Sequence, residues 1–353
     1  MRSSLRNFAF GIAALLALAL VAPAAAQSPA VDRAAQDAAA AQQARQLVQP
    51  LNNEPVWSEV RSGTPQVTQV RGRETDVLIQ PEGQTWRTLR NSFAAPWSGW
   101  AIVGVLVVIT AFYLWKGTMR LHEPPTGRRI RRFTQWQMAI HWITAFAFVM
   151  LAVSGIVIAF GKSFLLPVLG YSIFAWLTVL SKTLHNFVGP LFIVCIALMF
   201  FAYVRDNFWH RYDWIWIRHF GGLVSKHDVP SGKFNAGEKV WFWVGVVAGG
   251  IVVSASGLVL DFPNFDQTRF TMQVANIIHL GVASLFIVAA LGHTYMGTIG
   301  MQGAYRAMRD GYVDETWAKE HHLYWYNDVK AGKVPTAPED EPAPVRRVRG
   351  AKP

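Results

Sequence analysis

The chain has 353 residues, of which 52% are hydrophobic and 16% charged, and it contains 15 Trp and 22 Phe. About a quarter of the residues in a typical soluble domain are charged, so this composition argues against a soluble protein and indicates a membrane protein. The formal net charge of +11 does not indicate a nucleic-acid-binding surface, because the basic residues gather in the loops of one side.

The only cysteine, Cys195, lies in the middle of an apolar stretch. One thiol cannot form a disulfide framework or a four-cysteine iron–sulfur site, and the sequence has no C-x-x-C-H motif for covalent attachment of haem. We interpret Cys195 as a small buried hydrophobic residue. Any iron–sulfur centre must therefore belong to another chain.

The N-terminus has the three parts of a secretory signal: basic residues, a short apolar core and small residues up to Ala26. We predict a signal peptide at residues 1–26, because its apolar core is shorter than the roughly 20 residues of a spanning helix. Residues 27–95 are polar and show no catalytic motif. They are predicted to form a small or partly ordered periplasmic segment.

Five apolar stretches follow, each long enough to cross a bilayer and each without Asp, Glu, Lys or Arg. Backbone polar groups in lipid must be satisfied internally, so we predict an all-α integral membrane protein. The predicted spans are 97–115, 134–160, 184–204, 240–260 and 271–299. The first lies in an additional transmembrane helix at 96–117, the other four form a four-helix domain at 131–300, and residues 301–353 form a C-terminal tail.

The basic residues predict the orientation of these helices. The loops at 116–132 and 205–239 hold six Lys or Arg each, whereas the opposite loops hold Lys162 and Lys182 in one and Arg269 in the other. The positive-inside rule places the basic loops and the tail in the cytoplasm. We therefore predict a multi-pass protein of the bacterial inner membrane with a periplasmic N-terminus after signal cleavage. The last twenty or so residues are expected to be disordered.

Four histidines, His141, His185, His279 and His293, lie inside these apolar stretches. Ionisable side chains at that depth are costly and usually functional, and imidazole is an axial ligand of haem iron. His279 and His293 are separated by nearly four turns of one helix. They therefore project from the same face, about 21 Å apart along the axis at roughly 1.5 Å per residue.

Depth in the membrane pairs His185 with His279 near the outer side, and His141 with His293 near the inner side. We predict that each pair holds the iron of one haem b, giving an outer and an inner haem. The alternative for any single histidine is a hydrogen bond between helices or a place in a water-filled cavity. The other six histidines are predicted to be solvated: His122, His210, His219, His227, His321 and His322.

The stretch KFNAGEK, at residues 233–239, precedes the fourth predicted span. Asn235 and Glu238 have the spacing of a capping box, which alone accounts for both residues. A compatible interpretation is a polar quinone site beside the inner haem. Elsewhere, a Ser-Gly pair between apolar residues occurs at both 153–156 and 255–258. Small residues at helix contacts account for it; close approach of the backbone to a flat cofactor is the second interpretation.

The chain resembles the gamma subunit of respiratory formate dehydrogenase, a membrane cytochrome b subunit. The resemblance covers roughly residues 131 to 326. The KFNAGEK stretch and the HHLYWY tail at 321–326 are its most specific parts. The remaining motifs are QMAIHW at 137–142, LHNFVG at 184–189, IHL at 278–280 and HTYM at 293–296.

This resemblance implies four helices that bind two b haems with the pairing given above. It also implies a quinone site at Asn235, Gly237 and His293, with Glu238 as a further candidate, although the family is expected to carry Gln at that position. Menaquinone and ubiquinone both stay open as acceptors. The first helix and the periplasmic segment are additions to the four-helix core.

The resemblance further implies two partners, an iron–sulfur beta subunit and an alpha subunit that oxidises formate at a molybdenum or tungsten pterin. This chain would have no formate-oxidising site and would pass electrons inward to quinone. The complex as a whole could form a higher oligomer. The alternatives are the cytochrome b subunit of a membrane-bound hydrogenase, a haem-free membrane anchor, and a transporter, whose helices are typically interrupted in matched halves.

Overall fold

The structure is a computed structural model that describes residues 54–63, 82–222 and 229–334, with scattered residues between 33 and 48. The predicted signal peptide, His227 and the end of the predicted tail lie outside the described residues. Contacts divide the chain into two units, one of residues 1–89 with 262–274, the other of 90–261 with 275–353. The features below belong to the second unit unless stated otherwise.

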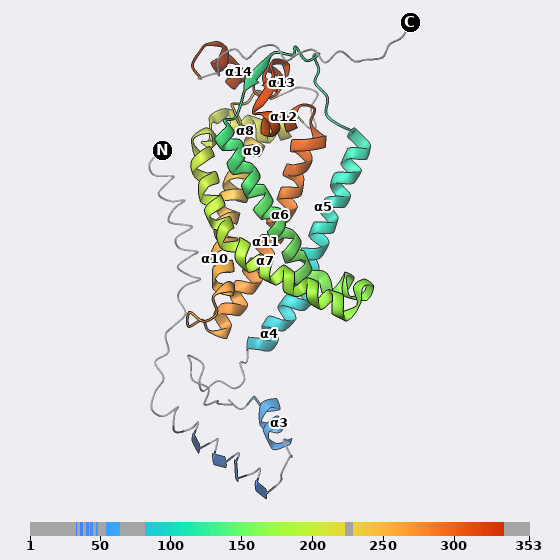
Figure 1. Ribbon diagram of the computed structural model, residues 1–353, viewed down its shortest axis with the longest axis vertical. Helices are drawn as coiled ribbons and strands as arrows, with labels where there is room; N and C mark the ends of the chain where they lie inside the picture. The colour runs from blue at the N-terminus through green and yellow to red at the C-terminus, as the bar shows by residue number, and fades with distance from the viewer. Residues whose placement is uncertain are drawn as a thin grey trace. The chain divides into compact units, whose positions relative to one another are not determined.

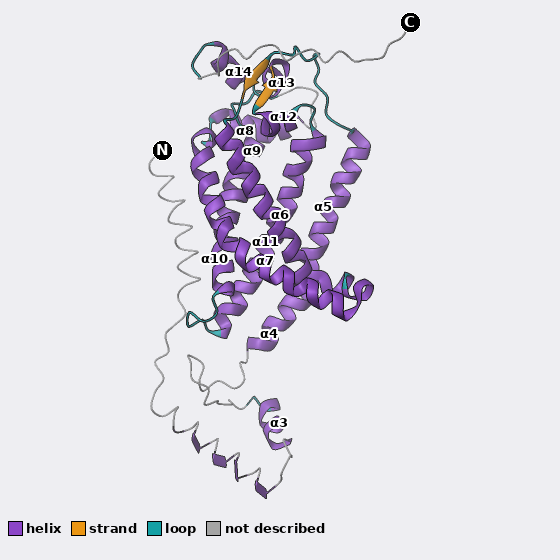
Figure 2. Ribbon diagram, in the orientation of Figure 1, coloured by secondary structure: helices purple, strands orange, loops and turns teal. Residues whose placement is uncertain are grey.

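Five helices of the described residues are long and apolar enough to cross a membrane, which confirms the predicted number of spans. Among the described residues, the regular structure is helical apart from two short strands (Figure 2). The chain is therefore a multi-pass membrane protein. Its candidate spans are Glu82–Lys116, Gln135–Phe164, Leu166–Asn207, Ala236–Asp261 and Arg269–Gly300.

These spans are assembled from shorter elements (Figure 1). The first joins α4 (Glu82–Thr88, in the first unit), the π-helix η1 (Leu89–Ala94) and α5 (Ala95–Lys116). The second is α6 (Gln135–Phe164), and the third is α7 (Leu166–Tyr203) with η2 (Val204–Asn207). The fourth joins α9 (Ala236–Val240), the π-helix η4 (Trp241–Gly249) and α10 (Gly250–Asp261). The fifth is α11 (Arg269–Tyr295) with the π-helix η5 (Met296–Gly300).

The predicted loop between the second and third spans is wrong. Lys162 lies in the last turn of α6, and α7 begins at Leu166 rather than at Leu184. Lys182 lies within α7, where it donates a hydrogen bond to Asn186 one turn later, 2.9 Å away. A single charged residue thus interrupts the apolar pattern here without ending the helix. The backbone of α7 is non-helical at Gly170 (φ 73°), and at roughly 1.5 Å per residue the part that follows is still longer than a bilayer core is thick.

The first span contacts α11 through side chains at two levels. Arg90 Nε donates a hydrogen bond to Asn276 Oδ1 at 3.1 Å, and further along both helices the ring of Phe112 lies edge-on to Tyr295 at 6.2 Å. Both helices therefore run in the same direction along the bundle. This position makes α5 a neighbour of the helix that carries two of the four membrane histidines.

The described part of the predicted tail is folded. Strand β2 (Tyr312–Asp314) pairs antiparallel with β1 (Arg129–Arg131). Around this pair lie α12 (Ala304–Asp310), α13 (Glu315–His321) and α14 (Leu323–Lys330). We call residues 301–334 together with β1 the C-terminal cap; it covers the end of the bundle from which α6 starts (Figure 1).

The C-terminal cap has its own core and a buried carboxylate. Its buried apolar residues include Ile130, Val313, Trp317 and Trp325. Helix α8 (Arg211–Arg218), which precedes α9, lies at the same end of the bundle (Figure 1). Glu315, at the start of α13, is 5% exposed. Its carboxylate contacts Arg128, which precedes β1, and Tyr326 and Lys330 of α14.

Hydrogen bonds determine the ionisation of Glu315. Burial alone would raise the pKa of this carboxyl group, but the hydrogen bonds from Lys330, Tyr326 and Arg128 outweigh burial and lower it to about 2. Because the folded pKa lies below the unfolded value, the ionised carboxylate stabilises the cap at neutral pH. That contribution is lost as the pH falls from about 4.5 towards 2.

We predict that Glu315→Gln loosens the C-terminal cap. At pH 7, amide hydrogen exchange of residues 312–330 should be about tenfold faster than in the wild type, since the lost hydrogen bonds to a charged group contribute on the order of 1–2 kcal/mol. At pH 3 the difference should shrink, because the carboxyl group of the opened, unfolded segment is then protonated while the folded one is still largely ionised. An equal difference at both pH values would contradict this role of the charge.

Candidate functional site

The structure brings the four membrane histidines together in two pairs. His141 on α6 and His293 on α11 have ring centroids 6.2 Å apart. His185 on α7 and His279 on α11 have ring centroids 6.1 Å apart. We call the first the cap-side pair and the second the distal pair. Helix α11 contributes one imidazole to each, at two levels along its length.

Both separations suit a metal ion held between two imidazoles. A metal–nitrogen bond of about 2 Å on each side, with about 1 Å from each nitrogen to its ring centre, places two ring centroids roughly 6 Å apart. Nδ1 of His141 is buried and has no hydrogen-bond partner among the described residues. A buried nitrogen without a partner is costly. The donor set, two imidazoles per pair, is one that haem iron accepts.

The cap-side pair is bordered by aromatic rings and irregular helix. Trp241 stacks on His293 at 5.1 Å between centroids with an angle of 17°, and Trp142 lies edge-on to His141 at 5.2 Å. Trp241 is the first residue of the π-helix η4, and η5 starts three residues after His293. Short π-helical segments occur frequently at functional sites. The pair therefore lies where two helices depart from regular geometry.

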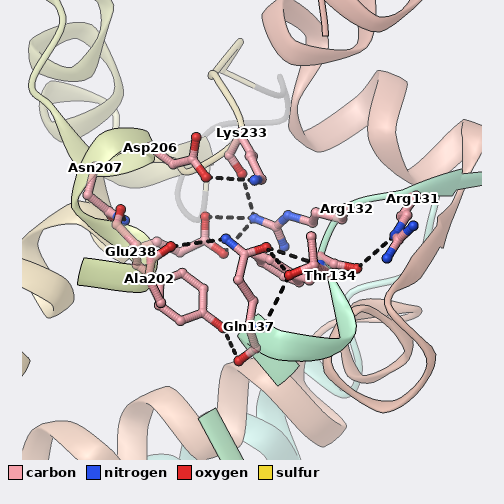
Figure 3. A network of polar contacts seen from close by, with 11 residues as sticks. Arg131, Arg132, Thr134, Gln137, Ala202, Asp206, Asn207, Lys233 and Glu238 are labelled. Carbon is pink, nitrogen blue, oxygen red and sulfur yellow. Dashed lines mark hydrogen bonds and ion pairs between the residues drawn. The ribbon is translucent and has the colours of Figure 1, made fainter. Parts of the chain in front are cut away.

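A polar network lies at the same end of the bundle (Figure 3). Arg132, 6% exposed, donates from Nη2 to both carboxylate oxygens of Glu238, at 3.0 and 3.2 Å, and to the carbonyl of Lys233 at 2.7 Å. Lys233 in turn pairs with Asp206 at 2.6 Å. The guanidinium also lies over the ring of Trp317 in the cap, 5.0 Å from its centroid. Arg132 therefore joins the KFNAGEK stretch to the cap.

The predicted capping box at the start of α9 is confirmed. The Asn235 side chain accepts a hydrogen bond from the backbone N–H of Glu238 at 2.9 Å, and Glu238 accepts one from the backbone N–H of Asn235 at 2.9 Å. A Cβ on Gly237 would lie 2.8 Å from the Trp216 ring, so the glycine permits this close packing. Asn235, Gly237 and Glu238 are thus neighbours, and Trp241, one turn further, connects them to His293.

The prediction that His322 is solvated is wrong. It is 1% exposed, and its Nδ1 donates a hydrogen bond to the carbonyl of Gly232 at 2.7 Å. Burial and the nearby Arg132 lower the pKa of His322 to about 3, so the ring is neutral at physiological pH. This hydrogen bond connects the cap to Gly232, the residue before the KFNAGEK stretch. His122, His210 and His219 are exposed, as predicted.

Sequence reasoning missed two kinds of residue in this region. In the sequence Arg132 is one of six basic residues of a loop, and nothing in its local sequence shows that it is buried. In the sequence Ser154 and Ser256 are small residues of a repeat, whereas in the structure their hydroxyls lie 2.9 and 3.1 Å from His185 Nδ1 and His279 Nδ1. The repeat itself was the available signal.

Comparison with known proteins agrees with this arrangement. Residues 132–311, which carry all four histidines, match the family described as prokaryotic cytochrome b561. The chain belongs to this family. The match implies that this cytochrome b binds haem b and transfers electrons in a membrane.

Its relatives include formate dehydrogenase cytochrome b subunits. The cytochrome b556(fdo) subunit of Escherichia coli K12 is 32% identical over 206 residues, which are 57% of this chain and 93% of the relative. The nitrate-inducible cytochrome b556(Fdn) subunit of the same strain is 30% identical over 214 residues, 57% and 92% of the two chains. A Haemophilus influenzae formate dehydrogenase cytochrome b556 subunit is 24% identical over 208 residues, 55% and 81%. The resemblance deduced from the motifs is confirmed.

We predict that Glu238→Gln keeps the helix start and the haem content of this cytochrome b but lowers its stability. An amide oxygen can still complete the capping box, whereas the charge that neutralises Arg132 is lost. Because the Glu238 side chain is about a third exposed, the loss should be on the order of 1–2 kcal/mol.

Thermal unfolding in detergent measures this loss. The matched control is Glu123→Gln, at an exposed glutamate, which should leave the unfolding midpoint unchanged. A wild-type midpoint for Glu238→Gln would show that the ion pair adds nothing.

Proposed function

We propose that this chain is the cytochrome b subunit of a formate dehydrogenase complex. It would carry electrons from a periplasmic iron–sulfur subunit through two b haems to quinone on the cytoplasmic side. The observation that carries the proposal is the presence of two imidazole pairs at two levels of α11, each with ring centroids about 6 Å apart. A bound haem b supplies a one-electron carrier at each pair.

The distal pair, His185 and His279, would hold the outer haem, and the cap-side pair, His141 and His293, the inner haem. The basic loops lie at the cap end of the bundle, which supports a cytoplasmic cap and a periplasmic N-terminus after signal cleavage, in a bacterial inner membrane. The chain would thus receive electrons at its distal end and deliver them beside the cap.

The quinone would bind near Asn235, Gly237, Glu238 and His293. The network of Arg132, Lys233 and Asp206 places charged groups at this end of the bundle, close to the residues that would bind the quinone. Taking protons from the cytoplasm while electrons move inward would separate charge across the membrane, worth about 2.3 kcal/mol per charge per 100 mV.

Formate oxidation belongs to partner chains in this proposal. The relatives named formate dehydrogenase subunits support it, and we infer an iron–sulfur beta subunit and an alpha subunit with a molybdenum or tungsten pterin. The one cysteine of this chain supports iron–sulfur centres on another chain. The same relatives favour formate dehydrogenase over a hydrogenase.

We predict that His293→Ala halves the haem content and stops quinone reduction. In the wild-type complex, copurified from membranes, formate should reduce both haems, and quinone should reoxidise them. The variant should retain one haem per chain that formate still reduces and quinone does not reoxidise. Absorbance difference spectra measure both steps, with His219→Ala, at an exposed histidine, as the matched control. Retention of two haems in His293→Ala would contradict the pairing of the histidines. Reduction of the wild-type haems by hydrogen but not by formate would contradict a formate-oxidising partner.

A further inference from the structure

The distal pair is held by two copies of one small arrangement. On α6, Ser154 is followed by Gly155, and both face His185 of α7. On α10, Ser256 is followed by Gly257, and both face His279 of α11 in the same way. In each case the serine and glycine come from the helix preceding the one that carries the histidine.

The hydrogen bonds of Ser154 determine which ring nitrogen of His185 carries the proton. The Ser154 hydroxyl donates its one hydrogen to the Met150 carbonyl at 2.7 Å. Its oxygen, 2.9 Å from His185 Nδ1, therefore accepts from the ring. His185 also forms a hydrogen bond with the Leu151 backbone. Nδ1 is thus the protonated nitrogen, and Nε2 keeps a free lone pair.

The second copy gives the same result for His279. The Ser256 hydroxyl donates to the Val252 carbonyl at 2.6 Å, so its oxygen accepts from His279 Nδ1 at 3.1 Å. The Val253 carbonyl, which can only accept, lies 3.1 Å from the same nitrogen. Two acceptors around Nδ1 require a proton there. His279 therefore also has Nε2 free for a metal.

The glycines allow each histidine ring to approach the preceding helix. A Cβ on Gly155 would lie 3.3 Å from His185 Cε1, and one on Gly257 would lie 3.2 Å from His279 Cε1. Contacts this short require the ring to move by a few tenths of an ångström. A side chain at either position would therefore push the imidazole away from its serine.

We propose that Ser154 and Ser256, each with its following glycine, are positioning residues that hold His185 and His279 as Nδ1–H tautomers for the outer haem. The inference rests on the proposed di-haem function. A hydrogen bond from the outer nitrogen of a ligand imidazole increases its basicity, which favours the oxidised metal and lowers the reduction potential.

Redox titration of the haem absorbance in Ser154→Ala and Ser256→Ala tests this. Both variants should bind two haems, and both should raise the midpoint potential of the same one of the two transitions, because both serines act on one haem. Electron paramagnetic resonance should show one of the two ferric signals shifted. The matched control is Ser284→Ala: Ser284 also donates to a carbonyl one turn back in α11, 2.7 Å away, and should leave both transitions unchanged.

The inference is overturned if neither variant moves a transition relative to Ser284→Ala, or if the two variants move different transitions. These outcomes differ from a failure of the proposed function, in which wild-type protein would bind fewer than two haems. The glycines give a second measurement. Gly155→Ala should shift the same ferric signal, whereas Gly104→Ala, at an open position on α5, should not.

Discussion

An imidazole on a membrane-spanning helix has two ring nitrogens, and in lipid each needs a partner other than water. Leaving a buried polar group unpaired costs on the order of 1–3 kcal/mol, so four such residues constrain the whole bundle. In the distal pair, serine hydroxyls and a backbone carbonyl satisfy Nδ1 and leave Nε2 free. The helices must therefore pack so that the histidines meet in pairs, and the rest of the bundle follows from that requirement.

Between the two pairs lies an apolar layer. Phe286 is on α11 midway between His279 and His293, and it packs against Phe148 of α6 at 4.8 Å and Phe192 of α7 at 6.3 Å between centroids. The buried core cluster of the bundle, which includes Ala147 and Cys195, surrounds these rings. A closely packed layer without charged groups keeps water away from the interior and fixes the distance between the pairs. Cys195 is buried there, as its apolar surroundings predicted.

Hydropathy predicts the membrane-spanning helices. It does not predict the features that depend on contacts between residues far apart in the sequence. The five spans were predictable because each must be apolar along its whole length, and the capping box because its residues are three apart. Hydropathy does not predict the start of α7, because Lys182 interrupts the apolar pattern within this helix. The C-terminal cap was missed because β1 pairs with β2 from far along the chain, and burial of His322 depends on that contact. The repeated serines were visible, but only the packed helices show which atoms they meet.

The central claim is that each pair of imidazoles holds one haem b. A pyridine haemochrome assay on purified, correctly folded chain measures this most directly. The account predicts two molecules of protohaem per polypeptide. A value of one or none would contradict it.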